Sequence, residues 1–284
     1  MVSLLGLEFI YMFLIILFLV PTFAILSSLY LYQHTGKREI LRFDLVQFVY
    51  AFILAPIVYV WFKSFLFVFL VSELNLHLSV TDLFIADTIF TIIFLYVFAF
   101  LVIHSLTKSF ELKRLRDPFY DIFQHSEFFH LITSHVILYF GLVLLITIIS
   151  TVNVFIPLEV ANNMLVFSVA MALGFLVGVL IYTGLLLTDD EFDIRYPRFE
   201  MFVELLFIVF FIYNIGLYFY FRPSFDLEYI MYWFVFMVLG GFITGSLVLD
   251  RSEKIVRRLK KFHYKSPKLT DPLIKEKAKK KKSK

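Results

Sequence analysis

The sequence contains no cysteine, so disulfide bonds, thiolate catalysis and cysteine-ligated metals are excluded. Glycine is scarce, with 10 residues against 38 phenylalanines, although membrane-spanning helices usually carry more glycine than this. Charged residues make up only 17% of the 284 residues, while 61% are hydrophobic and the mean hydropathy is +0.86. A soluble domain is about 25% charged and about 45–50% apolar. The apolar excess is too large for a buried core and predicts a surface that faces lipid.

Seven apolar stretches are long enough to cross the hydrocarbon core of a bilayer as α-helices, which takes about 20 residues. None of them shows the period of two that a membrane β-barrel requires. We therefore predict an all-α, polytopic membrane helix bundle over residues 1–249 and a basic tail over residues 250–284. The predicted spans are Ile10–Tyr32, Leu45–Leu70, Leu83–Ile103, Leu131–Ile149, Val160–Leu187, Met201–Tyr220 and Tyr229–Leu249.

The basic residues predict the orientation of these spans. With seven spans, 24 of the 26 Lys and Arg residues fall on one side of the membrane. Only Arg222 falls on the other side, and Lys63 lies within the second span. By the positive-inside rule the N-terminus is outside and the C-terminus is in the cytosol. The expected location is the plasma membrane of a prokaryote, or the endoplasmic reticulum or another organelle membrane of a eukaryote.

The C-terminal tail is the most basic part of the chain. Residues 250–284 hold 15 Lys and Arg against 4 Asp and Glu, whereas residues 1–249 hold 11 against 19. Residues 251–264 have the pattern of an amphipathic helix lying on the membrane, and the rest of the tail is polar enough to be disordered. Such a tail binds anionic lipid headgroups, at about 1 kcal/mol per basic residue near the surface. Contact of the tail with ribosomal RNA is the one nucleic-acid interaction that remains an alternative.

Small residues repeat at a spacing of four in the fifth and seventh spans. They are Ala170, Gly174 and Gly178 in one span, and Gly241 and Gly245 in the other. Small side chains at this spacing let two helix backbones approach closely, which is how helices associate in lipid. We therefore predict that these two spans contact each other in the middle and cytosolic part of the bundle.

Two ionisable residues fall inside predicted spans. Lys63 lies about eight residues from the outer end of the second span, and Asp87 lies at a similar depth in the third. Charged groups within a membrane are candidates for function, but a Lys–Asp pair also removes most of the cost of burying either charge. We predict an intramembrane ion pair between them with a structural role.

An acidic cluster follows the fifth span. Asp189, Asp190 and Asp193 lie in the sequence Asp-Asp-Glu-Phe-Asp, and Asp117 and Asp121 form a second pair on the same side. The first sequence resembles the DDxxD motif with which prenyl-transfer enzymes hold Mg²⁺ and a diphosphate, so the resemblance implies Mg²⁺ as a cofactor. Membrane prenyltransferases have more spans and a longer Asn/Asp motif that is missing here. The alternative is a solvated loop whose charges nearly balance.

Four histidines lie near the predicted cytosolic face: His104, His125, His130 and His135. A spacing of five residues turns the second ring about 140° away from the first on a helix, so one helix cannot present them together. A metal site would need His104 of the third span to face His130 or His135 of the fourth, with Glu200 or Glu204 of the sixth. The alternative is a set of interfacial histidines that contact lipid headgroups.

No motif identifies an activity, and three functions remain open. The absence of motifs, the aromatic surface and the basic tail favour a non-enzymatic scaffold, assembly factor or subunit of a larger complex, with lipid and other membrane proteins as partners. The acidic cluster would suit an enzyme at the cytosolic face that acts on a phosphorylated lipid or isoprenoid with Mg²⁺. A transporter would need a polar cavity between the spans.

Overall fold

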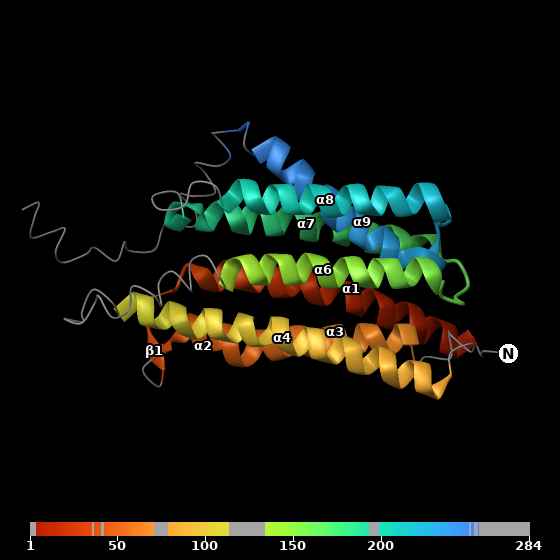
Figure 1. The fold of residues 1–284 in the computed structure, drawn as a ribbon, viewed down its shortest axis with the longest axis horizontal. Helices are drawn as coiled ribbons and strands as arrows, with labels where there is room; N and C mark the ends of the chain where they lie inside the picture. The colour runs from red at the N-terminus through yellow and green to blue at the C-terminus, as the bar shows by residue number, and fades with distance from the viewer. Residues whose placement is uncertain are drawn as a thin grey trace, which may run out of the picture.

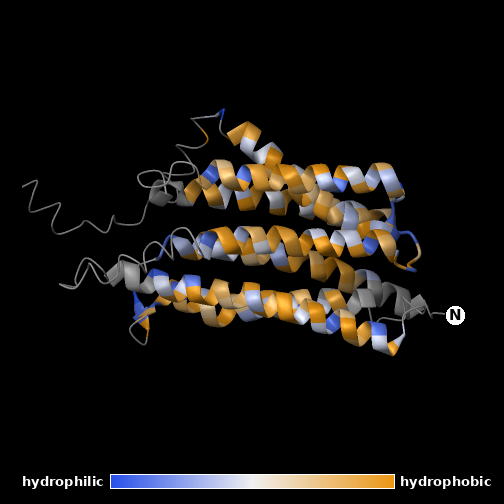
Figure 2. Cartoon of the chain, viewed as in Figure 1, coloured by the Kyte–Doolittle hydropathy of each residue, from blue (hydrophilic) through white to orange (hydrophobic). Residues whose placement is uncertain are grey.

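The computed structural model describes residues 4–35, 37–40, 43–70, 79–113, 134–192, 199–249, 251–252 and 255. Within these residues, seven helical segments are long and apolar enough to cross a membrane. Successive segments run in opposite directions through an all-α bundle (Figure 1). Hydrophobic residues extend along the helices, and polar residues gather near their ends (Figure 2). The chain is therefore a multi-pass integral membrane protein, as the sequence predicts.

The second span is built from three consecutive helical segments, and the seventh span begins with a short 3-10 helix. The elements are α1 (Leu4–Tyr32), β1 (Glu39–Ile40), β2 (Phe43–Asp44), α2 (Leu45–Val49), the π-helix η1 (Tyr50–Leu54), α3 (Ala55–Leu70), α4 (Val80–Lys113), α6 (His135–Phe155), α7 (Met164–Phe192), α8 (Phe199–Phe221), the 3-10 helix η5 (Leu227–Tyr229) and α9 (Ile230–Leu249). One end of the bundle contains the C-terminal ends of α1, α4, α7 and α9, and we call it the basic end. We call the other end of the bundle the opposite end.

The fifth span, α7, begins later than hydropathy predicts. It starts at Met164 rather than Val160, because Asn163 caps it. The Asn163 Oδ1 accepts hydrogen bonds from the backbone N–H groups of Leu165 and Val166, at 3.1 and 3.3 Å. A side-chain oxygen at this position satisfies N–H groups that have no partner within the helix. The cap therefore sets the boundary, although the apolar run begins before it.

Several helices run further than predicted, and a small hairpin was not predicted at all. The third span does not end at Ile103 but continues as α4 to Lys113, and α6 continues past Ile149 to Phe155. Hydropathy reports contact with lipid, whereas a helix ends where its hydrogen bonding is interrupted. The strands β1 and β2 pair antiparallel in the connection between α1 and α2.

The closest helix packing in the bundle joins α7 and α9. A methyl group on Gly174 would lie 2.8 Å from the carbonyl oxygen of Phe234, and one on Gly178 would overlap the carbonyl oxygen of Val238. The other small residues of this set are the buried Ala170 and two glycines of α9 that face α7, Gly241 and Gly245. Hydrogen at these positions lets the backbones touch, so the glycines set the separation of the two helices.

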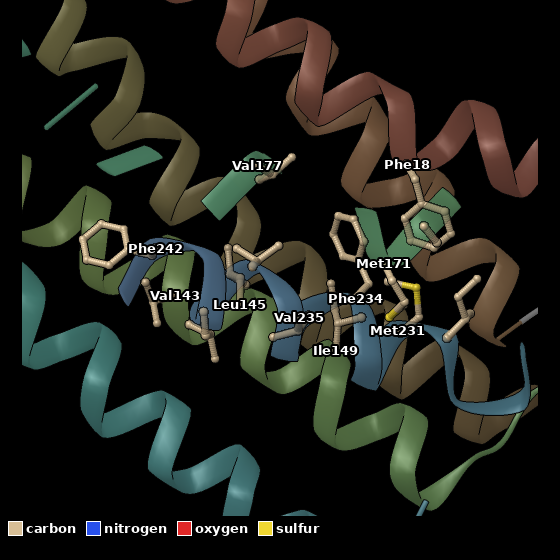
Figure 3. Packing of buried hydrophobic residues seen from close by; sticks show 14 of the residues in the cluster. Phe18, Val143, Leu145, Ile149, Met171, Val177, Met231, Phe234, Val235 and Phe242 are labelled. Atoms are coloured by element: carbon tan, nitrogen blue, oxygen red, sulfur yellow. The ribbon is translucent and has the colours of Figure 1, made fainter. Parts of the chain in front are cut away.

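Aromatic side chains connect the α7–α9 pair to its neighbours. Phe18 of α1 lies beside Phe234 of α9, with ring centroids 4.7 Å apart (Figure 3). On another side of α9, Phe242 stacks on Phe207 of α8. The α3 and α4 helices pack against each other and reach the rest of the bundle through α1 and α6. This arrangement places α1 and α6 between the α3–α4 pair and the α7–α9 core (Figure 1).

Candidate functional site

An apolar cavity of about 270 Å³ lies between the helices of the bundle and is partly open. Segments α1, η1, α3, α4, α6, α7 and α9 all contribute to its walls, including Leu145, Val177 and Val235, which Figure 3 labels. Its lining residues on α4 run from Phe94 to Leu101, which places the cavity in the middle of the bundle and towards the basic end. Almost all lining side chains are aliphatic or aromatic, so the cavity suits a hydrocarbon.

Two aromatic pairs form the wall between α3 and α4. The Tyr59 and Phe98 rings are 5.6 Å apart, and the Phe62 and Phe94 rings are 4.8 Å apart. All four residues line the cavity. Offset and tilted ring pairs at such distances are favourable, so these two pairs join α3 to α4 along this wall.

A proline in α1 lies beside the cavity. Pro21 has no N–H, so the carbonyl oxygen of Leu17 loses its normal partner within the helix. Trp61 on α3 replaces that partner and donates its indole N–H to the Leu17 oxygen at 2.6 Å. A carbonyl oxygen without a hydrogen-bond donor is costly in lipid. The bond from Trp61 removes this cost and joins α1 to α3.

The π-helix η1 is a second irregularity beside the cavity. The N–H of Ala55 bonds to the carbonyl oxygen of Tyr50, five residues earlier, and Pro56 follows without an N–H of its own. The Tyr50 hydroxyl donates to the carbonyl oxygen of Ser28 on α1 at 2.6 Å. Single turns of π-helix often occur at functional sites. These hydrogen bonds connect backbone and side chains across the wall and leave the cavity surface apolar.

A polar cluster lies one helical turn beyond the cavity, at the basic end. His104 Nδ1 on α4 is 3.1 Å from the hydroxyl of Ser134, and the His104 and His135 rings meet nearly at right angles with centroids 4.2 Å apart. Ser134 is buried and both histidines are half-buried. Leu101 and Leu138, which line the cavity, are three residues from His104 and His135 respectively, or about 4.5 Å along each helix.

The structure brings together two of the residues that the sequence proposed as metal ligands. His104 and His135 face each other from α4 and α6, whereas His125 and His130 lie outside the described residues. Glu200 accepts a hydrogen bond from the Tyr182 hydroxyl, and Glu204 accepts one from the Ser246 hydroxyl. Among the described residues, no three His, Asp or Glu side chains converge as a metal site would require.

The predicted Mg²⁺ site falls largely on residues that are not described. Asp189 and Asp190 lie in the last turns of α7, at the basic end. Asp193, Asp117 and Asp121 lie outside the described residues, as does most of the basic tail. The Mg²⁺ site and the amphipathic helix over residues 251–264 accordingly stay predictions.

The predicted intramembrane ion pair has a third member. Lys63 donates to the Asp87 carboxylate and, at 2.9 Å, to the hydroxyl of Thr91. The Lys63 and Asp87 side chains are 30% and 51% exposed, so the pair lies on the flank of the α3–α4 packing. Thr91 follows Asp87 by four residues, and this helical spacing is the signal that could have identified it.

A buried polar contact in the half of the bundle towards the opposite end was not predicted. The Ser150 hydroxyl of α6 donates to the Asn214 side chain of α8 at 2.7 Å, and the Asn214 amide donates to the carbonyl oxygen of Phe210. An Asn in an apolar span is costly unless it is bonded, and this is the signal that could have identified it. Because these groups bond to one another, they hold α6 against α8.

Comparison with known protein families, with characterised proteins and with solved structures finds no significant match. A fold alone does not identify a function, so the function has to be inferred from the cavity and the groups at its end.

Proposed function

We propose that this chain is a non-enzymatic membrane protein that binds the hydrocarbon chain of a lipid between its helices, as a subunit or scaffold of a larger membrane complex. The observation that carries the proposal is the apolar cavity of about 270 Å³ among segments that cross the membrane. The cavity is partly open, so the surroundings of the bundle can supply its occupant.

The surroundings of the cavity determine which occupant is available. A buried water needs two to four polar partners, and the cavity wall is almost wholly apolar. Trp61 on that wall already bonds to the backbone of α1. The solvent around the bundle is lipid hydrocarbon, so an acyl or isoprenoid chain fits the cavity and water does not.

The two tryptophans of the chain offer a direct test. Trp61 lines the cavity, whereas Trp233 bonds to Ser224 near the opposite end. In the W233F protein, purified in detergent, Trp61 is the only tryptophan. We expect a lipid with a dibrominated chain to quench its fluorescence saturably, because bromine quenches only nearby rings.

Variants that fill the cavity should remove this saturable quenching. V177F and A24F both add volume at lining positions, and either one alone is a sufficient test if the other fails to fold. The matched control is I92F, because Ile92 is 64% exposed on the outer face of α4. Equal quenching in the cavity variants and in I92F would mean that the lipid binds elsewhere, and the proposal would be wrong.

The proposal that the chain is a subunit of a larger complex can be tested separately. The α4 and α8 helices expose large apolar side chains along their outer faces, including Phe84, Tyr96, Leu205 and Phe219. Such a surface suits lipid or another membrane protein. We expect the gently extracted protein to migrate on native gels with other subunits, and a functional lone monomer would contradict this part.

A second candidate is an enzyme at the basic end that acts on a phosphorylated lipid or isoprenoid with Mg²⁺. The proximity of the cavity to His104 and His135, at the end where α7 carries Asp189 and Asp190, favours it. Changing Asp189, Asp190 and Asp193 together to Ala should then abolish Mg²⁺-dependent turnover, and unchanged turnover would exclude it. A transporter would need a polar path, which the apolar lining of this cavity does not favour.

A further inference from the structure

One face of α4 changes from apolar to polar at the end of the cavity. Val97, Leu101, His104 and Lys108 fall within an arc of about 60° on this helix. Val97 and Leu101 line the cavity, His104 meets His135, and Lys108 is buried one turn further towards the basic end. The helix therefore presents a hydrocarbon surface followed by polar side chains.

The facing helix makes the same change at the same level. On α6, Leu138 and Leu142 line the cavity, and Ser134 and His135 lie one turn closer to the basic end. Close packing holds the two helices in register, since a methyl group on Gly141 would lie 2.7 Å from a methyl of Val97. Two walls that turn from apolar to polar at one level match a ligand with a hydrocarbon chain and a polar head.

The chemistry of the cluster favours an anionic head over a metal ion. Lysine carries a positive charge and has donors only, and each histidine has at least one N–H donor in either tautomer. In the described part of the chain, no group of three or more His, Asp or Glu side chains could hold a metal ion. Charge-assisted hydrogen bonds from such donors are the usual means of binding phosphate.

We propose that His104, Ser134, His135 and Lys108 bind the phosphate of a lipid whose chain occupies the cavity. This inference rests on the proposed function and names its ligand class, a phosphate-bearing amphiphile. The same donors could hold a soluble phosphate ester, so the test has to separate the two sources.

The test compares two probes that differ only in the phosphate. A lysophosphatidate and a monoacylglycerol with the same dibrominated chain are titrated against the W233F protein, and the quenching of Trp61 gives each affinity. We expect the lysophosphatidate to bind about tenfold more tightly, the effect of one charge-assisted hydrogen bond. In the H104A/H135A variant this advantage should disappear while the monoacylglycerol binds as before.

Controls keep the two proposals separate. H34A changes an exposed histidine at the same end and should retain the advantage. If the double variant loses monoacylglycerol binding through misfolding, K108Q should still lose the preference selectively. Equal affinities in the W233F protein, or a preference that survives in both H104A/H135A and K108Q, would overturn the phosphate site and leave chain binding intact.

Two further outcomes complete the design. If neither probe binds, the proposed function itself fails. Glycerol 3-phosphate lacks the chain and should not displace the lysophosphatidate at comparable concentration. Displacement under those conditions would overturn the assignment to lipid in favour of a soluble phosphate ester.

Discussion

Asn153 on α6 accepts a hydrogen bond from the backbone N–H of Met231 at the start of α9, at 3.0 Å. Its Oδ1 also accepts from the N–H of Tyr232, and its amide donates to the carbonyl oxygen of Glu228. The first N–H groups of a helix have no partner within it. A side chain distant in sequence therefore caps α9 and fixes the approach of η5 to α6.

The N153A variant should destabilise the protein by about 2 kcal/mol, because it removes a helix cap and a further hydrogen bond to buried backbone groups. The midpoint of unfolding in a detergent titration would measure the loss. Asn162 is exposed in the next connection, so N162A is the matched control and should leave the midpoint unchanged. Equal midpoints for the two variants would show that the cap does not contribute.

The bond between Trp61 and the Leu17 carbonyl should depend on Pro21. W61F removes the donor and should cost about 1 kcal/mol, a typical value for one hydrogen bond. P21A restores a backbone N–H in α1 that can reach the Leu17 oxygen, so W61F should cost less in the P21A background. Thermal unfolding of the four proteins gives this coupling, and additive effects would contradict it.

The packing of α7 on α9 should not tolerate a methyl group at its centre. G178A places a Cβ against the Val238 carbonyl and should cost about 3 kcal/mol through overpacking. G216A on α8 is the control, because nothing lies within 4 Å of the added methyl group. It should be neutral or stabilise the helix by up to about 1 kcal/mol. The prediction is wrong if detergent unfolding ranks the two variants in the opposite order.

The Lys63–Asp87 pair should be more sensitive to the loss of one member than to the loss of both. Breaking a fully buried pair costs about 3–5 kcal/mol, and the partial exposure of these side chains reduces this to about 2 kcal/mol. K63M and D87L should each show that loss, because each leaves a charge without its counter-ion in lipid. The K63M/D87L double variant should recover part of it. A double variant less stable than either single one would argue against a structural role.

The absence of cysteine makes the predicted orientation simple to test. Lys37 is exposed at the basic end and Glu159 is exposed at the opposite end. K37C and E159C each introduce the only cysteine of the chain. In intact cells, or in vesicles of the same orientation, a membrane-impermeant maleimide should label E159C only. Labelling of K37C would show that the orientation is the reverse of the predicted one. The proposed phosphate site of His104, Ser134, His135 and Lys108 would then lie in the other leaflet.

Much of the helical architecture could be predicted from local patterns, and the exceptions have local causes. The α8 and α9 helices lie within a few residues of the apolar runs that predict them. The predicted start of α7 was wrong because the Asn163 side chain, and not hydropathy, sets where this helix begins. The pairing of His104 with His135 could be proposed from the sequence only as one of several combinations. Their selection depends on α4 packing against α6, which Gly141 permits.

Membrane insertion was determined by the sequence alone, because each span must meet the bilayer's demand for about 20 apolar residues independently of every other span. The cavity and the polar cluster at its end were decided only by the tertiary structure. Seven segments contribute to the cavity wall, and their side chains are as apolar as those that face lipid. Hydropathy cannot distinguish a cavity wall from a lipid-facing surface, since the difference lies in which helices become neighbours and how closely their backbones approach.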